Sequence, residues 1–160
     1  MKPLDILKQL KQESMLESYP NVPKYAISAP KYEDKTANGL TKCIIDFLQL
    51  SNHQAERINT MGRPIDNRKQ VTDVLGRTKT IGTMTWGKST ATKGSSDISA
   101  TIQGRSVKIE VKIGKDRQSE DQKIYQAKIE SSGGQYWIVK NFDDFIKKYE
   151  EFVESLKSNN

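Results

Sequence analysis

One stretch of the sequence limits the possible folds more than any other, the segment SDISATIQGRSVKIEVKIG at residues 96–114. Its second half alternates strictly, with aliphatic side chains at positions 107, 109, 111 and 113 and charged ones between them. A period of two predicts a β-strand with one apolar and one polar face. A short turn at residues 103–105, which contains a glycine, joins this run to a β-rich run at 97–102, so we expect a hairpin.

The polar face of this hairpin is expected to gather chemically active side chains. Folding the chain about Gly104 places Asp97 opposite Glu110 or Val111, and the strand period puts Glu110 and Lys112 on one face. Two adjacent carboxylates repel each other unless a cation lies between them, and Mg²⁺ suits such a pair. A nearby lysine could stabilise charge on a phosphate or orient an attacking water. The alternative is a solvated strand face with a cross-strand ion pair, because a Glu-x-Lys pattern arises readily by chance in so charged a chain.

Helices and strands are expected on both sides of the hairpin. Hydrophobic periodicity predicts helices at residues 36–52, 119–134 and 141–156, and strands within 54–62, ended by Gly62, and at 135–139. The second of these helices has the clearest ends, a Ser-x-x-Gln capping box at its start and two glycines after it. The order of elements predicts an α/β (α+β) domain with a mixed central β-sheet flanked by helices.

The first 36 residues differ from the rest in composition. A helix is expected over residues 3–17, followed by a proline-rich extended arm. We therefore divide the chain into an N-terminal helix and arm, residues 1–36, and a domain, residues 37–157. The N-terminal piece is expected to pack on the domain or on a second subunit.

Basic residues are concentrated in residues 61–93, which hold seven of them against two acidic residues, a net charge of +5 out of +6 for the chain. The segment RTKTIGTMTW within it predicts a β-ribbon or a mobile loop. Its Thr, Ser and Gly residues suit phosphate contacts, and Trp86 could stack on a base or pack within a loop. A solvated basic loop without a ligand is the alternative. The candidate nucleic-acid-binding residues are Arg63, Arg68, Lys69, Arg77, Lys79, Lys88 and Lys93, together with Lys115 and Arg117 after the hairpin.

Several classes of protein are disfavoured by composition. No apolar run approaches the length of a membrane span, and the N-terminus lacks the apolar core of a signal peptide, so no membrane association is expected. Cys43 is the only cysteine and lies in an apolar run, which indicates a buried thiol and a cytoplasmic protein. With His53 as the only histidine, a zinc site or a histidine-centred nuclease can be set aside.

The segments SSDI, IEVKIGKDRQSEDQ and GGQYWIVKNFDDF follow one another at suitable spacing. Together they resemble the PD-(D/E)XK nuclease superfamily, in particular its VRR-NUC-like and Holliday-junction-resolvase-like branches, over about residues 37–145. The resemblance implies a restriction-endonuclease-like fold, metal binding by Asp97 and Glu110, assistance to the nucleophile by Lys112, and Gln122 completing the site. The implied cofactor is Mg²⁺, with Mn²⁺ as a substitute. Gln122 is also the third residue of the capping box, so it has a structural explanation as well.

The chain departs from the family pattern at two places. Ser96 stands where the family commonly has a proline before the aspartate. Many members carry an acidic residue at the start of the first domain helix, where this chain reads TANGLTK. Asp46 and Glu56 are candidate substitutes, and the third alternative is that no acid fills this role.

These observations lead to one leading expectation and two alternatives. The leading one is a Mg²⁺-dependent DNA endonuclease, selective for branched or junction DNA, whose basic segment grips the backbone. A homodimer and a phage or mobile-element origin fit this expectation. The first alternative is a nucleic-acid-binding module on the same fold that lacks catalysis. The second is an interaction protein, which should not bind nucleic acid even at low salt.

Overall fold

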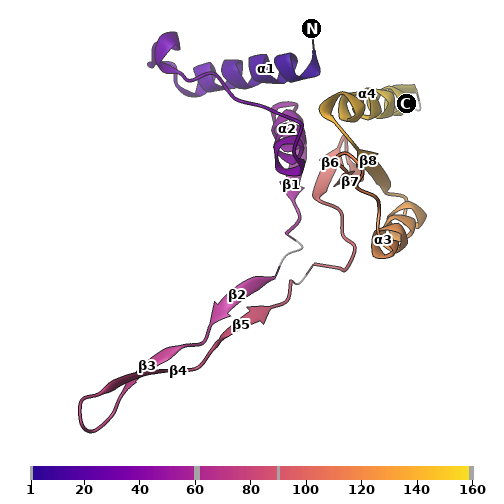
Figure 1. Ribbon diagram of the computed structural model, residues 1–160. Helices are drawn as coiled ribbons and strands as arrows, with labels where there is room; N and C mark the ends of the chain where they lie inside the picture. The colour runs from indigo at the N-terminus through magenta and orange to yellow at the C-terminus, as the bar shows by residue number, and fades with distance from the viewer. Residues whose placement is uncertain (1, 60–61, 90, 159–160) are drawn as a thin grey trace. The chain divides into compact units, whose positions relative to one another are not determined.

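The computed structural model describes residues 2–59, 62–89 and 91–158, which belong to two compact units (Figure 1). The larger unit, called the body below, comprises Met1–Ile58 and Lys93–Asn160. The smaller, called the arm from here on, comprises Asn59–Thr92 and is distinct from the proline-rich N-terminal arm of the sequence analysis.

The body is built on a four-stranded mixed sheet with the strand order β1-β6-β7-β8. Strand β6 (Ile98–Ile102) is antiparallel to both of its neighbours, β1 (Gln54–Arg57) and β7 (Arg105–Val111), and β8 (Gln135–Val139) runs parallel to β7. A parallel step needs a crossover, which α3 (Glu120–Ser131) provides. The predicted mixed sheet flanked by helices is therefore confirmed.

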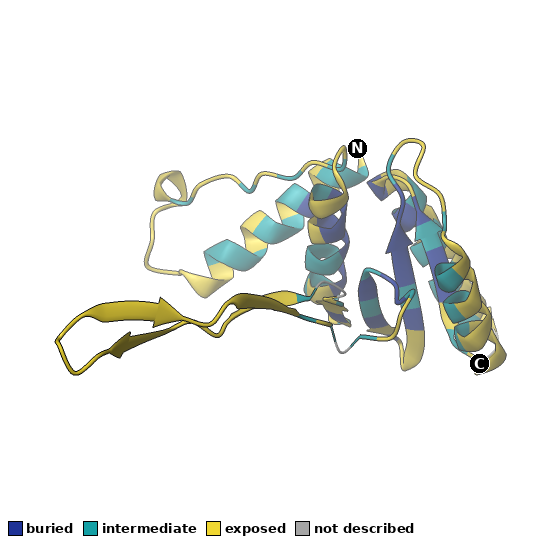
Figure 2. Cartoon of the chain, turned by 60° about the horizontal axis from the view of Figure 1, so that its bottom comes forward, coloured by how far each residue is buried: buried dark blue, intermediate teal, exposed yellow. Residues whose placement is uncertain are grey.

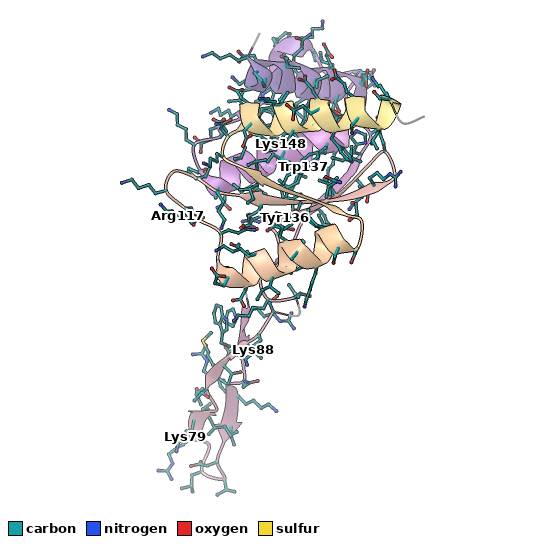
Figure 3. All side chains as sticks on the ribbon, turned by 90° about the vertical axis from the view of Figure 1, so that its right-hand side faces the viewer. Lys79, Lys88, Arg117, Tyr136, Trp137 and Lys148 are labelled. Carbon is teal, nitrogen blue, oxygen red and sulfur yellow. The ribbon has the colours of Figure 1, made fainter. Side chains whose placement is uncertain are left out.

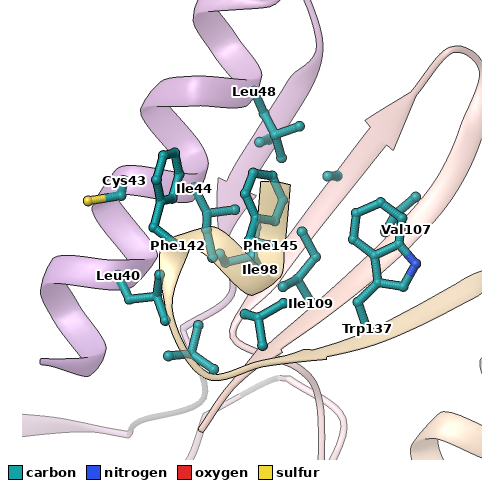
Figure 4. Packing of buried hydrophobic residues seen from close by; sticks show 14 of the residues in the cluster. Leu40, Cys43, Ile44, Leu48, Ile98, Val107, Ile109, Trp137, Phe142 and Phe145 are labelled. Carbon is teal, nitrogen blue, oxygen red and sulfur yellow. The ribbon is translucent and has the colours of Figure 1, made fainter. Parts of the chain in front are cut away.

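Helices α2 (Ala37–Leu50) and α4 (Phe142–Ser158) cover the apolar face of this sheet, and α1 (Pro3–Ser18) packs on both of them. Their buried side chains form one cluster with those of the sheet, and the aliphatic residues expected on α2 and β7 lie in it (Figure 4). The fully buried members include Leu40, Ile44, Leu48, Ile98, Val107, Ile109, Phe142 and Phe145. Among the described residues, no helix is both long and apolar enough to cross a membrane.

The N-terminal segment packs on the rest of the body. Leu7 of α1 is fully buried in the core cluster, and α1 contacts both α2 and α4. The segment that follows includes a 3₁₀ turn at Lys24–Ala26. Tyr32 there donates a hydrogen bond to Asp46 of α2 (2.6 Å), and Asp34 accepts one from the backbone N of Phe142 (3.0 Å). Of the two packings expected for this piece, the structure has the one on the chain's own domain.

The arm is a two-stranded antiparallel ribbon in two sections. Strand β2 (Arg63–Asp66) pairs with β5 (Met84–Gly87), and β3 (Lys69–Thr72) pairs with β4 (Thr78–Ile81). Every residue of these strands is exposed except Gly87, which is half-buried (Figure 2). The segment is thus a β-ribbon and not an irregular loop, and it has no core of its own.

The strand expected within residues 54–62 is shorter than predicted. Strand β1 ends at Arg57, because its pairing with β6 stops at the pair Arg57 and Ile98. One further hydrogen bond follows, from Ile58 N to Asp97 O (2.8 Å). Gly62 therefore does not end this strand, and residues 60–61 lie outside the described residues.

Candidate active site

The two candidate carboxylates lie across the β6–β7 hairpin from each other. Ile98 pairs with Ile109, and continuing this register by one residue sets Asp97 opposite Glu110. The Asp97 carboxylate also accepts a hydrogen bond from the backbone N of Val111 (2.9 Å). The hairpin thus fixes Asp97 at the end of β7, next to Glu110.

Glu110 and Lys112 are buried, not solvated. Their exposed fractions are 2% and 7%, and Lys112 Nζ lies 3.0 Å from Glu110 Oε1. Lys112 Nζ also lies 3.4 Å from a carboxylate oxygen of Asp116. These side chains point away from the apolar core, but α3 covers this second face of the sheet. The alternative of an ordinary solvated strand face therefore does not describe this pair.

Gln122 serves the helix and the candidate site together. The Ser119 hydroxyl accepts a hydrogen bond from Gln122 N (3.3 Å), and Gln122 Oε1 accepts one from Ser119 N (2.9 Å), which completes the predicted capping box. The amide Nε2 of Gln122 remains to donate a hydrogen bond to Glu110 Oε1. The cap therefore orients the side chain that holds Glu110, so the two roles expected for Gln122 coexist.

Two neighbours of the pair were missed in the sequence, Asp116 and Tyr136. The Tyr136 hydroxyl donates a hydrogen bond to Glu110 Oε2 (3.3 Å), and its ring makes an edge contact with Tyr125 of α3. Tyr136 reaches this face because β8 is parallel to β7 with Lys108 opposite Tyr136. Only the parallel register brings it there, and periodicity within one strand cannot give that register. Asp116 carries a weak signal, since it lies four residues after Lys112 in a basic turn.

The electrostatics of the site favour a further positive charge. Burial raises the pKa of Glu110, and the nearby charge of Asp97 raises it further, while hydrogen bonds from Lys112 and Tyr136 oppose the shift. Burial alone would lower the pKa of Lys112, but its hydrogen bond to Glu110 and the charges of Glu110 and Asp116 outweigh burial and raise it. The lysine is therefore held as a cation beside Glu110, whose carboxylate is repelled by that of Asp97.

Of the two candidates for a further acid, the structure separates one from the site. Asp46 lies on α2, which packs on the apolar face, and it is engaged by Tyr32 and Lys42. Glu56 pairs with Ser99, two residues from Asp97 and on the same side of the sheet, and it is exposed. Glu56 is thus the candidate that shares a face with Asp97 and Glu110.

The chain enters β6 past the first turn of α3. A Cβ atom at Gly94 would come within 2.3 Å of the backbone O of Asp121, so this close approach requires glycine. Lys93 forms an ion pair with the Asp121 side chain (3.0 Å). Ser96 is fully buried and donates a hydrogen bond to Ile98 O (3.1 Å), which shapes the turn before Asp97 without a proline.

All nine basic residues proposed to bind nucleic acid are exposed. Lys115 and Arg117 lie in the loop between β7 and α3, and Figure 3 labels Arg117 there and Lys79 and Lys88 on the arm. On the arm, Arg68 pairs with Asp66 (2.8 Å) and Arg77 with Asp73 (3.1 Å). Within the described residues, no carboxylate forms an ion pair with the other four arm cations, which are Arg63, Lys69, Lys79 and Lys88.

The two tryptophans and the cysteine have different environments. Trp137 lies in the core against Phe145 and Phe152, as the sequence predicts. Trp86 is 65% exposed on β5, and its indole lies against the backbone of Gly62. Cys43 is fully buried as predicted, and burial raises the pKa of its thiol to about 11, so it is not a reactive nucleophile.

Comparison with known proteins found no match for this chain. The chain matches no protein-family model, and neither a curated protein nor a solved structure is significantly similar to it.

Proposed function

We propose that this chain is a metal-dependent endonuclease that hydrolyses phosphodiester bonds in branched DNA. The observation that carries the proposal is the paired carboxylates of Asp97 and Glu110 with the buried ammonium of Lys112 beside them. A buried ion pair contributes little to stability, because desolvation offsets most of the attraction between its charges. Such a pair at the end of a strand, next to a basic loop, is better explained by chemistry than by folding.

The residues fit Mg²⁺ in kind, and Mn²⁺ as its substitute. Mg²⁺ prefers carboxylate oxygens and is commonly held by one or two of them with water in its other positions. Asp97 and Glu110 would hold it, and Glu56 lies on the same face. A bound divalent ion would polarise the phosphodiester and lower the pKa of an attacking water.

The chain's own residues would position the reaction. Lys112, held by Glu110 and Asp116, presents a fixed positive charge that would stabilise the charge developing on the phosphate. Gln122 and Tyr136 each donate a hydrogen bond to one oxygen of Glu110, so its carboxylate has a defined orientation. The resemblance to the PD-(D/E)XK superfamily and its restriction-endonuclease-like fold is consistent with these roles and remains a prediction.

The arm and the loop after β7 would hold the DNA backbone. Cations without acid partners attract phosphates and release counterions, and this attraction does not depend on base sequence. An enzyme that grips DNA in this way selects shape, which suits branched or junction substrates. A homodimer remains a prediction, to be tested by the molar mass of the chain in solution.

The decisive test is cleavage of junction, duplex and single-stranded DNA in the presence of Mg²⁺ or Mn²⁺. We expect the wild type to cut branched DNA, Glu110→Ala and Lys112→Ala to lose nearly all cleavage, and each variant still to bind. Lys108→Ala is the matched control, because Lys108 lies on the same strand and face, and among the described residues its ammonium donates its hydrogen bond to Ser99 (2.6 Å) and not to a residue of the candidate site. If Glu110→Ala or Lys112→Ala cuts as well as the wild type, the site is assigned wrongly.

A second candidate function is a nucleic-acid-binding module without catalysis. It is favoured by two observations. Both oxygens of Glu110 already accept hydrogen bonds from protein groups. In the described part of the chain, no group of three or more His, Cys, Asp or Glu side chains is arranged to hold a metal ion. Binding by the wild type without cleavage under either metal would support this function over the first.

A further inference from the structure

The far end of the arm presents two aliphatic side chains to solvent. Val74 is 103% exposed and Leu75 is 72% exposed in the turn between β3 and β4. Of the twelve large hydrophobic residues that are exposed in the described chain, seven lie within the 34 residues of the arm. The apolar surface of the arm is therefore a local feature, and its most exposed point is the tip.

The tip is ordered by hydrogen bonds of its own. One oxygen of the Asp73 carboxylate accepts hydrogen bonds from Leu75 N and Arg77 N, each 2.9 Å long. Asp73 N donates to Arg77 O and Gly76 N donates to Asp73 O, also at 2.9 Å, and Gly76 has a left-handed φ of 77°. The turn is thus fixed by its own hydrogen bonds, and the side chains of Val74 and Leu75 are exposed to solvent.

The positive charges next to the tip, on Lys69 and Lys79, favour a polyanion as the partner of the arm. Asp73 is neutralised by Arg77, so the tip carries no uncompensated negative charge. The register places Lys69 and Lys79 on one face of the ribbon, where they alternate with Val71 and Ile81. The other face of this section holds only Gln and Thr side chains, at positions 70, 72, 78 and 80. A purely apolar protein partner would gain nothing from these lysines, whereas phosphates would.

We propose that the arm enters a groove of duplex DNA and that Val74 and Leu75 insert between base pairs. A two-stranded ribbon is of a size that fits a groove, and aliphatic side chains that insert between base steps unstack them and bend the duplex. Insertion is easiest where stacking is already interrupted, so the tip would favour branch points over continuous duplex. The inference rests on the proposed function, and it names the device by which that function would select branched DNA.

The test uses the full chain without added metal and a four-way junction that carries 2-aminopurine beside the branch. We expect binding of the wild type to raise the fluorescence of 2-aminopurine as the base unstacks. The double variant Val74→Ser/Leu75→Ser should lose this rise but keep its affinity within about fivefold, because the arm cations remain. Lys69→Gln/Lys79→Gln should show the opposite, weaker binding with the rise retained at saturation. Val22→Ser, which changes an exposed valine of the body, is the control and should match the wild type.

The possible failures can be told apart. If the wild type binds the junction without a rise, or the tip variant gives the same rise, the insertion is wrong while DNA binding stands. If the wild type binds no DNA even at low salt, the proposed function fails, and the insertion fails with it. A third outcome is that the tip variant fails to dimerise or to bind phosphatidylserine vesicles, while neither it nor the wild type changes the fluorescence of 2-aminopurine. In that case the tip contacts protein or lipid, and the inference is overturned.

Discussion

The body and the arm differ in whether their apolar side chains are buried or exposed. The body, 126 residues with a net charge of +2, buries its aliphatic and aromatic side chains in one cluster. The arm, 34 residues with six basic and two acidic side chains and so a net charge of +4, leaves its apolar side chains in solvent. An isolated two-stranded ribbon is marginal in water, and the binding of a partner by its exposed apolar and basic residues remains our proposal. The apolar residues of the body, in contrast, are explained by the core that they form.

The largest expected effect is on the stability of the body. Phe145→Ala removes a fully buried ring that packs against Phe47, Phe142, Trp137 and Tyr149, and should lower the free energy of unfolding by about 3–5 kcal/mol. The matched change in the arm, Ile81→Ala, should alter it by no more than about 0.5 kcal/mol. Guanidinium unfolding followed by tryptophan fluorescence measures both. Similar values for the two variants would mean that the arm has a core after all.

Removing one partner of the buried ion pair should give the next largest effect on stability. Lys112→Met leaves Glu110 buried without its cation and should lower the free energy of unfolding by about 3 kcal/mol. In the double variant Lys112→Met/Glu110→Leu the unpaired buried charge is also removed, so most of the lost free energy of unfolding should be recovered. The corresponding change in the arm, Arg68→Met, breaks an exposed pair and should leave the unfolding midpoint unchanged. A double variant no more stable than Lys112→Met alone would contradict the account of this pair.

A smaller effect is expected at the cap of α3. Ser119→Ala removes the hydroxyl that accepts a hydrogen bond from Gln122 N and should lower the free energy of unfolding by about 1 kcal/mol. It should also reduce cleavage, if cleavage is observed, because Gln122 would hold Glu110 less well. Ser131→Ala, at the other end of the same helix, is the control and should change neither quantity.

The smallest effect concerns pH and also belongs to the body. Burial lowers the pKa of His53 below its ordinary value of 6.5, and its ring lies 2.9 Å from the Tyr149 hydroxyl. His53 therefore binds a proton more readily in the unfolded chain than in the folded one. Its contribution to stability is fully present above pH 6.5 and is lost as the pH falls below that value. His53→Asn should weaken this decrease between pH 7 and 5.5 in thermal unfolding. An unchanged pH profile would show that His53 makes no contribution.

Much of the body could be predicted from the sequence because its signals are local. The alternation in β7, the capping box of α3 and the apolar stripe of α2 each lie within one element, and each was enough to place its residues. The end of β1 could not be predicted, because it depends on where the partner strand β6 ends. Tyr136 was missed for a related reason, since the register of a parallel pair is set by packing and not by either strand alone.

The candidate site could be predicted in part. The hairpin brought Asp97 and Glu110 together as expected, because a short turn fixes the register of the strands it joins. The burial of Glu110 and Lys112 was not foreseen. It results from α3 covering the polar face of the sheet, which is a property of the tertiary fold.

The place where the arm leaves the body has a consequence for how the chain folds. Arg57 and Ile98 are direct partners in the sheet although 40 residues separate them. If the ribbon forms first, the β2–β5 pairing shortens the loop to be closed between these two strands from about 40 to about 15 residues, and the entropy cost of closing it falls by about 0.9 kcal/mol. We therefore expect variants that weaken the β2–β5 pairing to slow the folding of the body even where they leave its equilibrium stability unchanged.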